Sequence, residues 1–113
     1  MKLNKLQSIT PSKYRSVRTT VDGITFHSKR EANRYSELKL LERCEKITFL
    51  ELQVPYKLKV NGILIATYIA DFRYLDVATM KTVVEDAKGV ITPTYRMKAK
   101  LMEALYQIKI VEV

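Results

Sequence analysis

Apolar residues recur three positions apart between residues 28 and 43, which is the spacing that places side chains on one face of an α-helix. Ser28 and Glu31 have the spacing of a capping box, in which the first residue caps a helix and the second lies in its first turn. The pattern therefore predicts an amphipathic helix from an N-cap at Ser28 to about Arg43. Its apolar face consists of Ala32, Tyr35, Leu38 and Leu41.

A strand-like pattern follows this helix. Asn61 and Gly62 separate two apolar runs, and this pair suits a type I′ hairpin turn because both central residues need a positive φ. We therefore expect antiparallel strands at Tyr56–Val60 and Ile63–Leu75. Pro55 has no backbone N–H, so it marks either the start of its strand or a strand at the sheet edge.

The last third of the chain predicts one more strand at Lys81–Lys88, a helix at Tyr95–Gln107 and a short final strand at 108–113. A strand reached through a helix lies most naturally parallel to a strand of the same sheet. The predicted fold is thus a two-layer α/β core with a mixed sheet, in the order helix, three strands, helix, strand. The side chains expected to point inward from the last helix are Met97, Leu101, Ala104 and Leu105.

The first 20 residues are polar and basic, and Pro11 interrupts any helix there. We expect them to form a flexible basic arm. Asp22 and Gly23 then predict a turn before a short extended piece. A chain of 113 residues is long enough for one core, so residues 21–113 are interpreted as a single domain.

The chain has a formal net charge of +8 and an isoelectric point near 9.6, and the excess positive charge gathers before Asp22 and in the stretch "YRMKAK". Clustered positive charge favours polyanions, because each neutralised phosphate releases counterions. A basic protein without a nucleic-acid partner stays open on charge alone. No apolar run approaches the length of a membrane span, and the single Cys44 excludes an internal disulfide, so we expect an intracellular protein with no membrane partner.

Two strand ends carry acids where apolar residues are usual. Alternation of side chains places Asp86 and Lys88 on one face of their strand and Glu85 on the other. Asp71 lies near the end of the preceding strand, so pairing of the two strands would bring two carboxylates within reach of one cation. Mg²⁺ prefers oxygen ligands and keeps several waters, and the carbonyl of Ala87 is a further candidate ligand. Lys88 is suited to hold or deprotonate an attacking water, or to neutralise charge on a phosphate.

Simpler interpretations of these residues stay open at this point. In one interpretation, Lys88 forms only a surface salt bridge with Asp71 or Asp86, which contributes roughly 0–1 kcal/mol to stability. Glu31 is either a helix cap alone or also a metal ligand. His27 has no partner motif and is interpreted as a packing residue in a turn.

Several stretches together resemble a family of small phage and prophage proteins of the PD-(D/E)xK nuclease superfamily. They are "KYRSVRTTVDGITFHSKREANRYSEL", "LELQVPYKL", "YIADFRY", "VVEDAKG" and "YRMKAKLMEALY". The resemblance implies a restriction-endonuclease-like core of the same element order. It also assigns the first motif acid to Asp71, the second acid and the lysine to Asp86 and Lys88, a further metal ligand to Glu31 and a supporting role to Gln53.

The chain departs from the superfamily pattern at two positions. Ala70 stands where the motif name has proline, and Asp86 stands where glutamate is common. The motif tolerates both changes.

The resemblance implies a DNA endonuclease that depends on Mg²⁺ or Mn²⁺. Branched DNA, as for a resolvase acting in phage recombination or packaging, is one implied substrate, with a homodimer in the bacterial host cytoplasm as the acting form. A non-catalytic nucleic-acid-binding protein with the same fold, and a regulatory factor with a basic surface, are the alternatives. The basic residues expected to hold DNA phosphates are Arg15, Arg18, Lys29, Arg30, Arg34, Arg96, Lys98 and Lys100.

Overall fold

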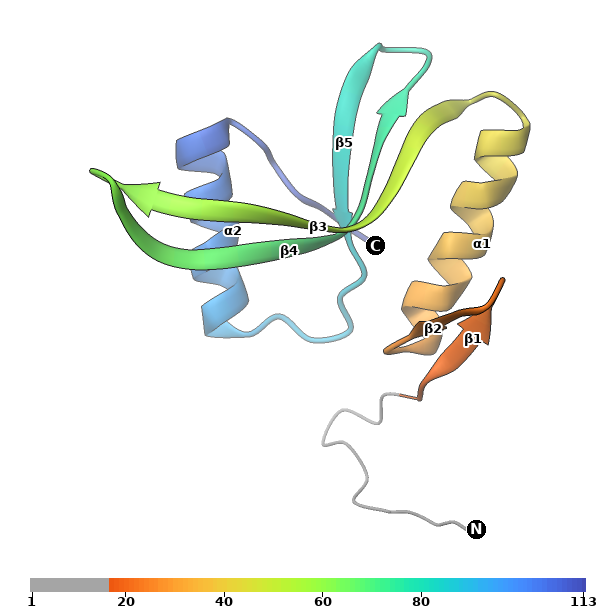
Figure 1. Cartoon of the computed structure of the whole chain (residues 1–113), viewed down its shortest axis with the longest axis horizontal. Coiled ribbons are helices and arrows are strands. Elements are labelled where there is room, and N and C mark those ends of the chain that lie inside the picture. The colour runs from red at the N-terminus through yellow and green to blue at the C-terminus, as the bar shows by residue number, and fades with distance from the viewer. Residues whose placement is uncertain (1–16) are drawn as a thin grey trace, which may run out of the picture.

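The structure is a computed structural model and describes residues 17–113. These residues form two sheets and two helices (Figure 1). Strands β1 and β2 make a two-stranded sheet, and the other four strands make a sheet in the order β3-β4-β5-β6. The elements are β1 (Thr19–Val21), β2 (Ile24–Phe26), α1 (Lys29–Arg43), β3 (Ile47–Val60), β4 (Ile63–Asp76), β5 (Lys81–Asp86), α2 (Pro93–Tyr106) and β6 (Val111–Glu112).

The larger sheet is mixed, as predicted. β3, β4 and β5 pair antiparallel in sequence order, and β6 pairs parallel to β5 after the crossover through α2. The α/β class and the order helix, three strands, helix, strand are confirmed. Of the described residues, no helix combines the length and apolar composition needed to cross a membrane.

The first helix begins where the capping box predicts. The Ser28 hydroxyl accepts a hydrogen bond from the Glu31 N–H at 3.1 Å, and Ala32, Tyr35 and Leu38 are buried. The Glu31 carboxylate turns back further than the capping box requires and accepts from the N–H of His27 at 3.2 Å. Glu31 thus caps the helix while its side chain is buried beside the sheet.

The inward face of α2 agrees with the prediction in part, because the predicted Leu101 and Leu105 pack partly buried against a hydrophobic cluster beneath the helix. Met97 and Ala104 are exposed, whereas Tyr95 and Met102 are buried. The sequence offers two competing apolar stripes, and tertiary contacts select the one that starts at Tyr95. This residue packs beside Tyr68 of β4, with ring centroids 6.3 Å apart, so the helix is rotated relative to the predicted orientation.

The long β3–β4 hairpin turns at the predicted position, with φ of 51° at Asn61 and 78° at Gly62. β3 begins nine residues earlier than predicted, at Ile47 instead of Tyr56. Pro55 lies within it and pairs with Ile69, so the expectation of an edge strand is confirmed and that of a strand start is wrong. Edge position explains why a residue without an N–H fits there.

Two boundaries also differ from the sequence interpretation. β5 ends at Asp86, two residues before the predicted end of its strand. β1 begins at Thr19, inside the segment expected to be a flexible arm, and pairs with β2 across a turn with φ of 53° at Asp22 and 76° at Gly23. Arg15 and the rest of the arm up to residue 16 lie outside the described residues.

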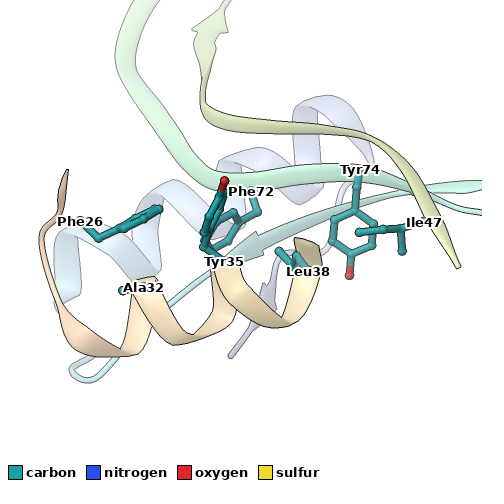
Figure 2. Packing of buried hydrophobic residues seen from close by; sticks show 7 residues of the cluster. All are labelled: Phe26, Ala32, Tyr35, Leu38, Ile47, Phe72 and Tyr74. Carbon is teal, nitrogen blue, oxygen red and sulfur yellow. The ribbon is translucent and has the colours of Figure 1, made fainter. Parts of the chain in front are cut away.

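Two hydrophobic clusters hold the helices against the sheet. Phe72 and Tyr74 of β4 pack with Tyr35 and Leu38 of α1, as Figure 2 shows. Tyr68, on the same strand, belongs to a second cluster with residues of α2.

Each strand of the β3–β4 hairpin contributes residues to both clusters, and on each strand there is one position where it passes from one cluster to the other. On β4 it lies between Ala70, in the α2 cluster, and Phe72, in the α1 cluster, so Asp71 stands at this crossing. On β3 it lies between Leu52 and Val54. The fold thereby leaves polar positions at the point where the hairpin passes from one helix to the other.

Candidate functional site

Asp71 lies where the pairing of β4 with β5 ends. Phe72 pairs with Glu85, so Asp71 and Asp86 are the next residues on their respective strands. Beyond the last backbone pair, the Asp71 side chain continues the link between the strands: its Oδ2 accepts a hydrogen bond from the N–H of Ala87 at 2.9 Å. The predicted convergence of the two acids is therefore present, and the Ala87 backbone adjoins them.

Asp86 is buried between Tyr68 and Lys88. Its Oδ2 accepts a hydrogen bond from the Tyr68 hydroxyl at 2.7 Å, and its Oδ1 lies 3.5 Å from Lys88 Nζ. Burial raises the pKa of Asp86 to about 7, Tyr68 opposes this rise, and the adjacent Asp71 adds to it. Near neutral pH this carboxyl therefore retains a proton far more readily than an ordinary aspartate.

Lys88 is held at the site from two directions. Its backbone N–H donates to the carbonyl of Val113 at 3.2 Å, so the end of the chain fixes the segment after β5. Its ammonium lies 4.4 Å from the centroid of the Tyr95 ring, which is within the range of a cation–π contact. Lys88 thus lies beyond the end of β5 and not within it, but its side chain reaches Asp86 as the prediction of a shared face requires.

Glu31 joins the site through Gln53. The amide nitrogen of Gln53 lies 2.9 Å from Glu31 Oε2 and 3.3 Å from Asp71 Oδ1, so one side chain donates to both acids. Burial raises the pKa of Glu31, and the negative charge of Asp71 raises it further. Gln53 thus has the supporting contact that the sequence comparison implied.

The backbone of Gln53 is unusual for a strand. Its φ of 53° lies in the left-handed region, which costs a residue other than glycine about 1–3 kcal/mol. Gln53 lies between Leu52 and Val54, where β3 changes from one hydrophobic cluster to the other. The strained residue is therefore the one that connects the two acids.

The acids and Lys88 line one pocket of about 880 Å³, and Gln53 supports it from outside the lining. Five of the predicted site residues line it, together with three of the predicted basic residues at its rim. The eight are Glu31, Asp71, Asp86, Ala87, Lys88, Lys29, Arg30 and Lys98. A cluster of acids surrounded by basic side chains is suited to an anionic substrate bound through a cation.

The other predicted phosphate-binding residues lie elsewhere. Arg96 and Lys100 are exposed on α2, and Arg18 is exposed before β1, but none of these three lines the pocket. Arg34 donates from Nε and Nη2 to the carboxylate of Glu85 at 2.8 and 2.6 Å. These bonds raise the pKa of Arg34 and give it an internal partner that the sequence did not predict.

Sequence reasoning missed the contribution of Tyr68. Strand alternation places Tyr68 and Asp71 on opposite faces of β4, so the sequence pattern carries no signal that both belong to one site. Tyr68 packs in the cluster beside α2, and from there its hydroxyl reaches Asp86. His27, interpreted as a packing residue, is exposed at the pocket wall.

A divalent cation fits the donors at this site, although no three His, Cys, Asp or Glu side chains among residues 17–113 gather into a complete metal-binding group. Mg²⁺ needs only one or two protein carboxylates, because waters and phosphate oxygens complete its octahedral shell. Burial is the first cause of the raised pKa values of Glu31 and Asp86, and the neighbouring Asp71 carboxylate raises both further. A cation bound by Asp71 and Asp86 would relieve this repulsion.

A known family matches almost the whole chain. Residues 11–112 match the family described as "Protein of unknown function (DUF1064)". The chain belongs to this family. The searches of curated proteins and of solved structures found no match. The function must therefore be inferred from the site itself.

Proposed function

We propose that this DUF1064 protein is a metal-dependent nuclease that hydrolyses phosphodiester bonds in DNA, with a restriction-endonuclease-like fold of the PD-(D/E)xK superfamily. The observation that carries the proposal is the convergence of Asp71, Asp86 and Lys88 in one pocket with a basic rim. One acid comes from β4 and the other ends β5, and the lysine follows two residues after the end of β5. This arrangement matches the motif that the sequence resembles.

Asp71 and Asp86 would hold Mg²⁺ or Mn²⁺, with Glu31 beside them and the Ala87 carbonyl as a proposed further ligand. The cation supplies charge neutralisation at the phosphate and lowers the pKa of a bound water. Tyr68 fixes Oδ2 of Asp86, which leaves Oδ1 directed toward Lys88.

The cationic residues of the pocket act on the substrate. Water attacks the phosphorus and forms a new P–O bond while the P–O bond to the leaving oxygen breaks. The water loses a proton to solvent and the leaving oxygen takes one up, and negative charge grows on the phosphate oxygens in the transition state. The Lys88 ammonium is placed to donate a hydrogen bond to this charge or to orient the water. Lys29, Arg30 and Lys98 at the rim would position the DNA backbone without reading its sequence.

Further parts of the proposal rest on the resemblance and on no contact in the structure. They are branched DNA as a substrate, a role in recombination or packaging, a homodimer, and a phage or prophage protein acting in the bacterial cytoplasm.

The first experiment incubates a labelled four-way junction, a linear duplex and single-stranded DNA with the protein in Mg²⁺, in Mn²⁺ and in chelator. We expect cleavage with either metal, none in chelator, and none by Asp71→Asn. Asp76→Asn is the matched control, because Asp76 lies at the far end of the same strand, where its side chain accepts from the Ala78 N–H. Binding without cleavage in either metal would support the non-catalytic alternative and overturn the proposal.

A further inference from the structure

The outer half of the β3–β4 hairpin has one covered face and one open face. Val54, Leu58 and Tyr68 face α2 and are buried. Ile65 and Ile69, by contrast, are about half exposed, at 50% and 51%. Figure 1 shows the tip of this hairpin extending past α2, away from the rest of the sheet.

Basic residues accompany the open isoleucines. Lys57 pairs with Thr67 across the hairpin, so both side chains lie on the same face, and Pro55 pairs with Ile69 in the same way. Lys59 follows near the turn and is exposed. The sequence from residue 52 to residue 70 contains these two lysines and no aspartate or glutamate. The open face therefore carries positive charge only.

This face is continuous with the candidate site. Thr67 and Ile69 line the pocket, and Asp71 is the next residue in the alternation along β4. At about 3.4 Å per residue, the strand from Asp71 to Ile63 spans roughly 27 Å. That length corresponds to about eight base pairs of duplex, which rise 3.4 Å each.

We propose that this open face, made of Pro55, Lys57, Lys59, Ile65, Thr67 and Ile69 and termed the hairpin platform, binds a double-stranded DNA arm next to the phosphodiester in the pocket. The inference rests on the proposed nuclease function and specifies its substrate as DNA with a duplex arm on one side of the cut. A two-stranded ribbon has the width that the major groove admits. The lysines contact phosphates, and the isoleucines contact apolar edges of the groove.

A second copy of this chain is a poorer occupant for the platform. Two such faces would bring four lysines together with no acid between residues 52 and 70 to oppose them, in a protein whose net charge is already +8. Like charges placed opposite one another destabilise an interface. Duplex DNA instead supplies the complementary charge along the whole face.

The test measures binding by fluorescence anisotropy in chelator, with labelled DNA whose duplex arm is 4, 8, 12 or 16 base pairs long and continues as a single strand. The platform variants are Lys57→Gln with Lys59→Gln, and separately Ile65→Thr, which keeps a β-branched side chain. The control variant is Lys81→Gln with Lys109→Gln, which removes the same charge from exposed positions outside the platform.

We expect affinity to rise with arm length up to about eight base pairs and then to level off. The double lysine variant should bind the longer arms at least tenfold more weakly, with a salt-dependence slope reduced by about two, because each lost phosphate contact removes about 0.9. Ile65→Thr should weaken binding severalfold at an unchanged salt slope. The control variant should bind nearly as wild type does.

The platform proposal would be overturned by an affinity that does not depend on arm length, or by an equal loss of affinity in the control variant. It would also be overturned if a platform variant changed the sedimentation of the protein, because the face would then be a self-association surface. Failure of the nuclease proposal is separate. If binding depends on arm length but no cleavage occurs in either metal, the nuclease proposal is rejected and the platform proposal is supported. No binding of the wild type to any of these DNAs would overturn both.

Discussion

Glu85 and Asp86 are adjacent on β5 and both are buried, but the groups around the two carboxylates differ. Glu85 faces α1, where the Arg34 guanidinium donates two hydrogen bonds and the Tyr74 hydroxyl donates a third. Asp86 faces the pocket, where Tyr68 donates one hydrogen bond and a second acid lies alongside. Glu85 is paired with a guanidinium through two hydrogen bonds, whereas Asp86, with Lys88 at 3.5 Å and an acid beside it, has its pKa raised to about 7 by burial.

This difference separates a structural acid from a functional one. A buried ion pair with all its hydrogen bonds fixes the position of its helix and offers nothing to a ligand. A buried acid kept beside another acid costs stability, and such a cost is typical of sites that bind a cation or a proton. We therefore predict that substitution of Glu85 lowers the stability of the fold, whereas substitution of the adjacent Asp86 lowers activity.

The largest expected effect is on cleavage. Asp86→Asn removes a proposed metal ligand, so cleavage in Mg²⁺ should fall by about a thousandfold or more, which corresponds to several kcal/mol of lost charge stabilisation. DNA affinity in chelator should be equal to or tighter than that of the wild type, since a negative charge near the phosphate is lost. Cleavage assays would measure the loss of activity, and fluorescence anisotropy would measure the DNA affinity. Undiminished cleavage would remove Asp86 from the site.

Glu85→Gln should instead damage the fold. It leaves the Arg34 guanidinium without its buried partner, and breaking such a pair costs about 3 kcal/mol. Chemical denaturation would measure the loss. The matched control is Glu37→Gln, which removes the other, exposed partner of Arg34 and should cost under about 1 kcal/mol. A stable Glu85→Gln protein without metal affinity would place Glu85 in the metal site and contradict the comparison.

Tyr68→Phe should have a smaller effect and act on metal affinity. Removing the hydroxyl frees Asp86 to rotate, and loss of such a supporting contact typically weakens metal binding by 10–100-fold. Calorimetric titration with Mn²⁺ would measure the change. Tyr35→Phe removes a hydroxyl bonded to Asp22, outside the pocket, and should leave Mn²⁺ affinity unchanged. Equal affinities in all three proteins would show that Tyr68 does not position Asp86 for metal.

The smallest effect concerns the stability of the metal-free protein. The pKa of Asp86 is raised from 3.8 to about 7 by folding, so the folded state holds a proton more tightly than the unfolded state between these values. Stability from this group is therefore present at low pH and is lost as pH rises from about 4 through about 7. The buried Glu31, whose pKa is also raised, acts in the same direction.

Thermal melts in chelator would reveal this contribution. Asp86→Asn should be more stable than the wild type by about 1 kcal/mol at pH 8, and the advantage should shrink at pH 5, where the wild-type carboxyl is protonated. Addition of Mg²⁺ at pH 8 should raise the melting temperature of the wild type and not of the variant. A variant less stable than the wild type at both pH values would show that Asp86 carries no unfavourable charge.

The sequence alone determined the features that depend on neighbouring residues. Ser28 caps the first helix, and Asn61 with Gly62 turns the hairpin, because both signals arise from local backbone geometry. The separation of Glu85 from Asp86 likewise follows from the alternation of side chains along one strand. Asp86 and Lys88 were therefore assigned to one face before any long-range contact was known, whereas the approach of Asp71 depended on the pairing of its strand with theirs.

Only the tertiary structure decided the contacts that depend on the path of the hairpin. The orientation of α2, the partner of Arg34 and the hydrogen bond from Tyr68 to Asp86 all require knowing how β3 and β4 pass from one hydrophobic cluster to the other. That change at Gln53 and Asp71 arises from packing against two helices distant in sequence, which no local pattern encodes. It is also what brings Glu31, Gln53 and Tyr68 to the two acids.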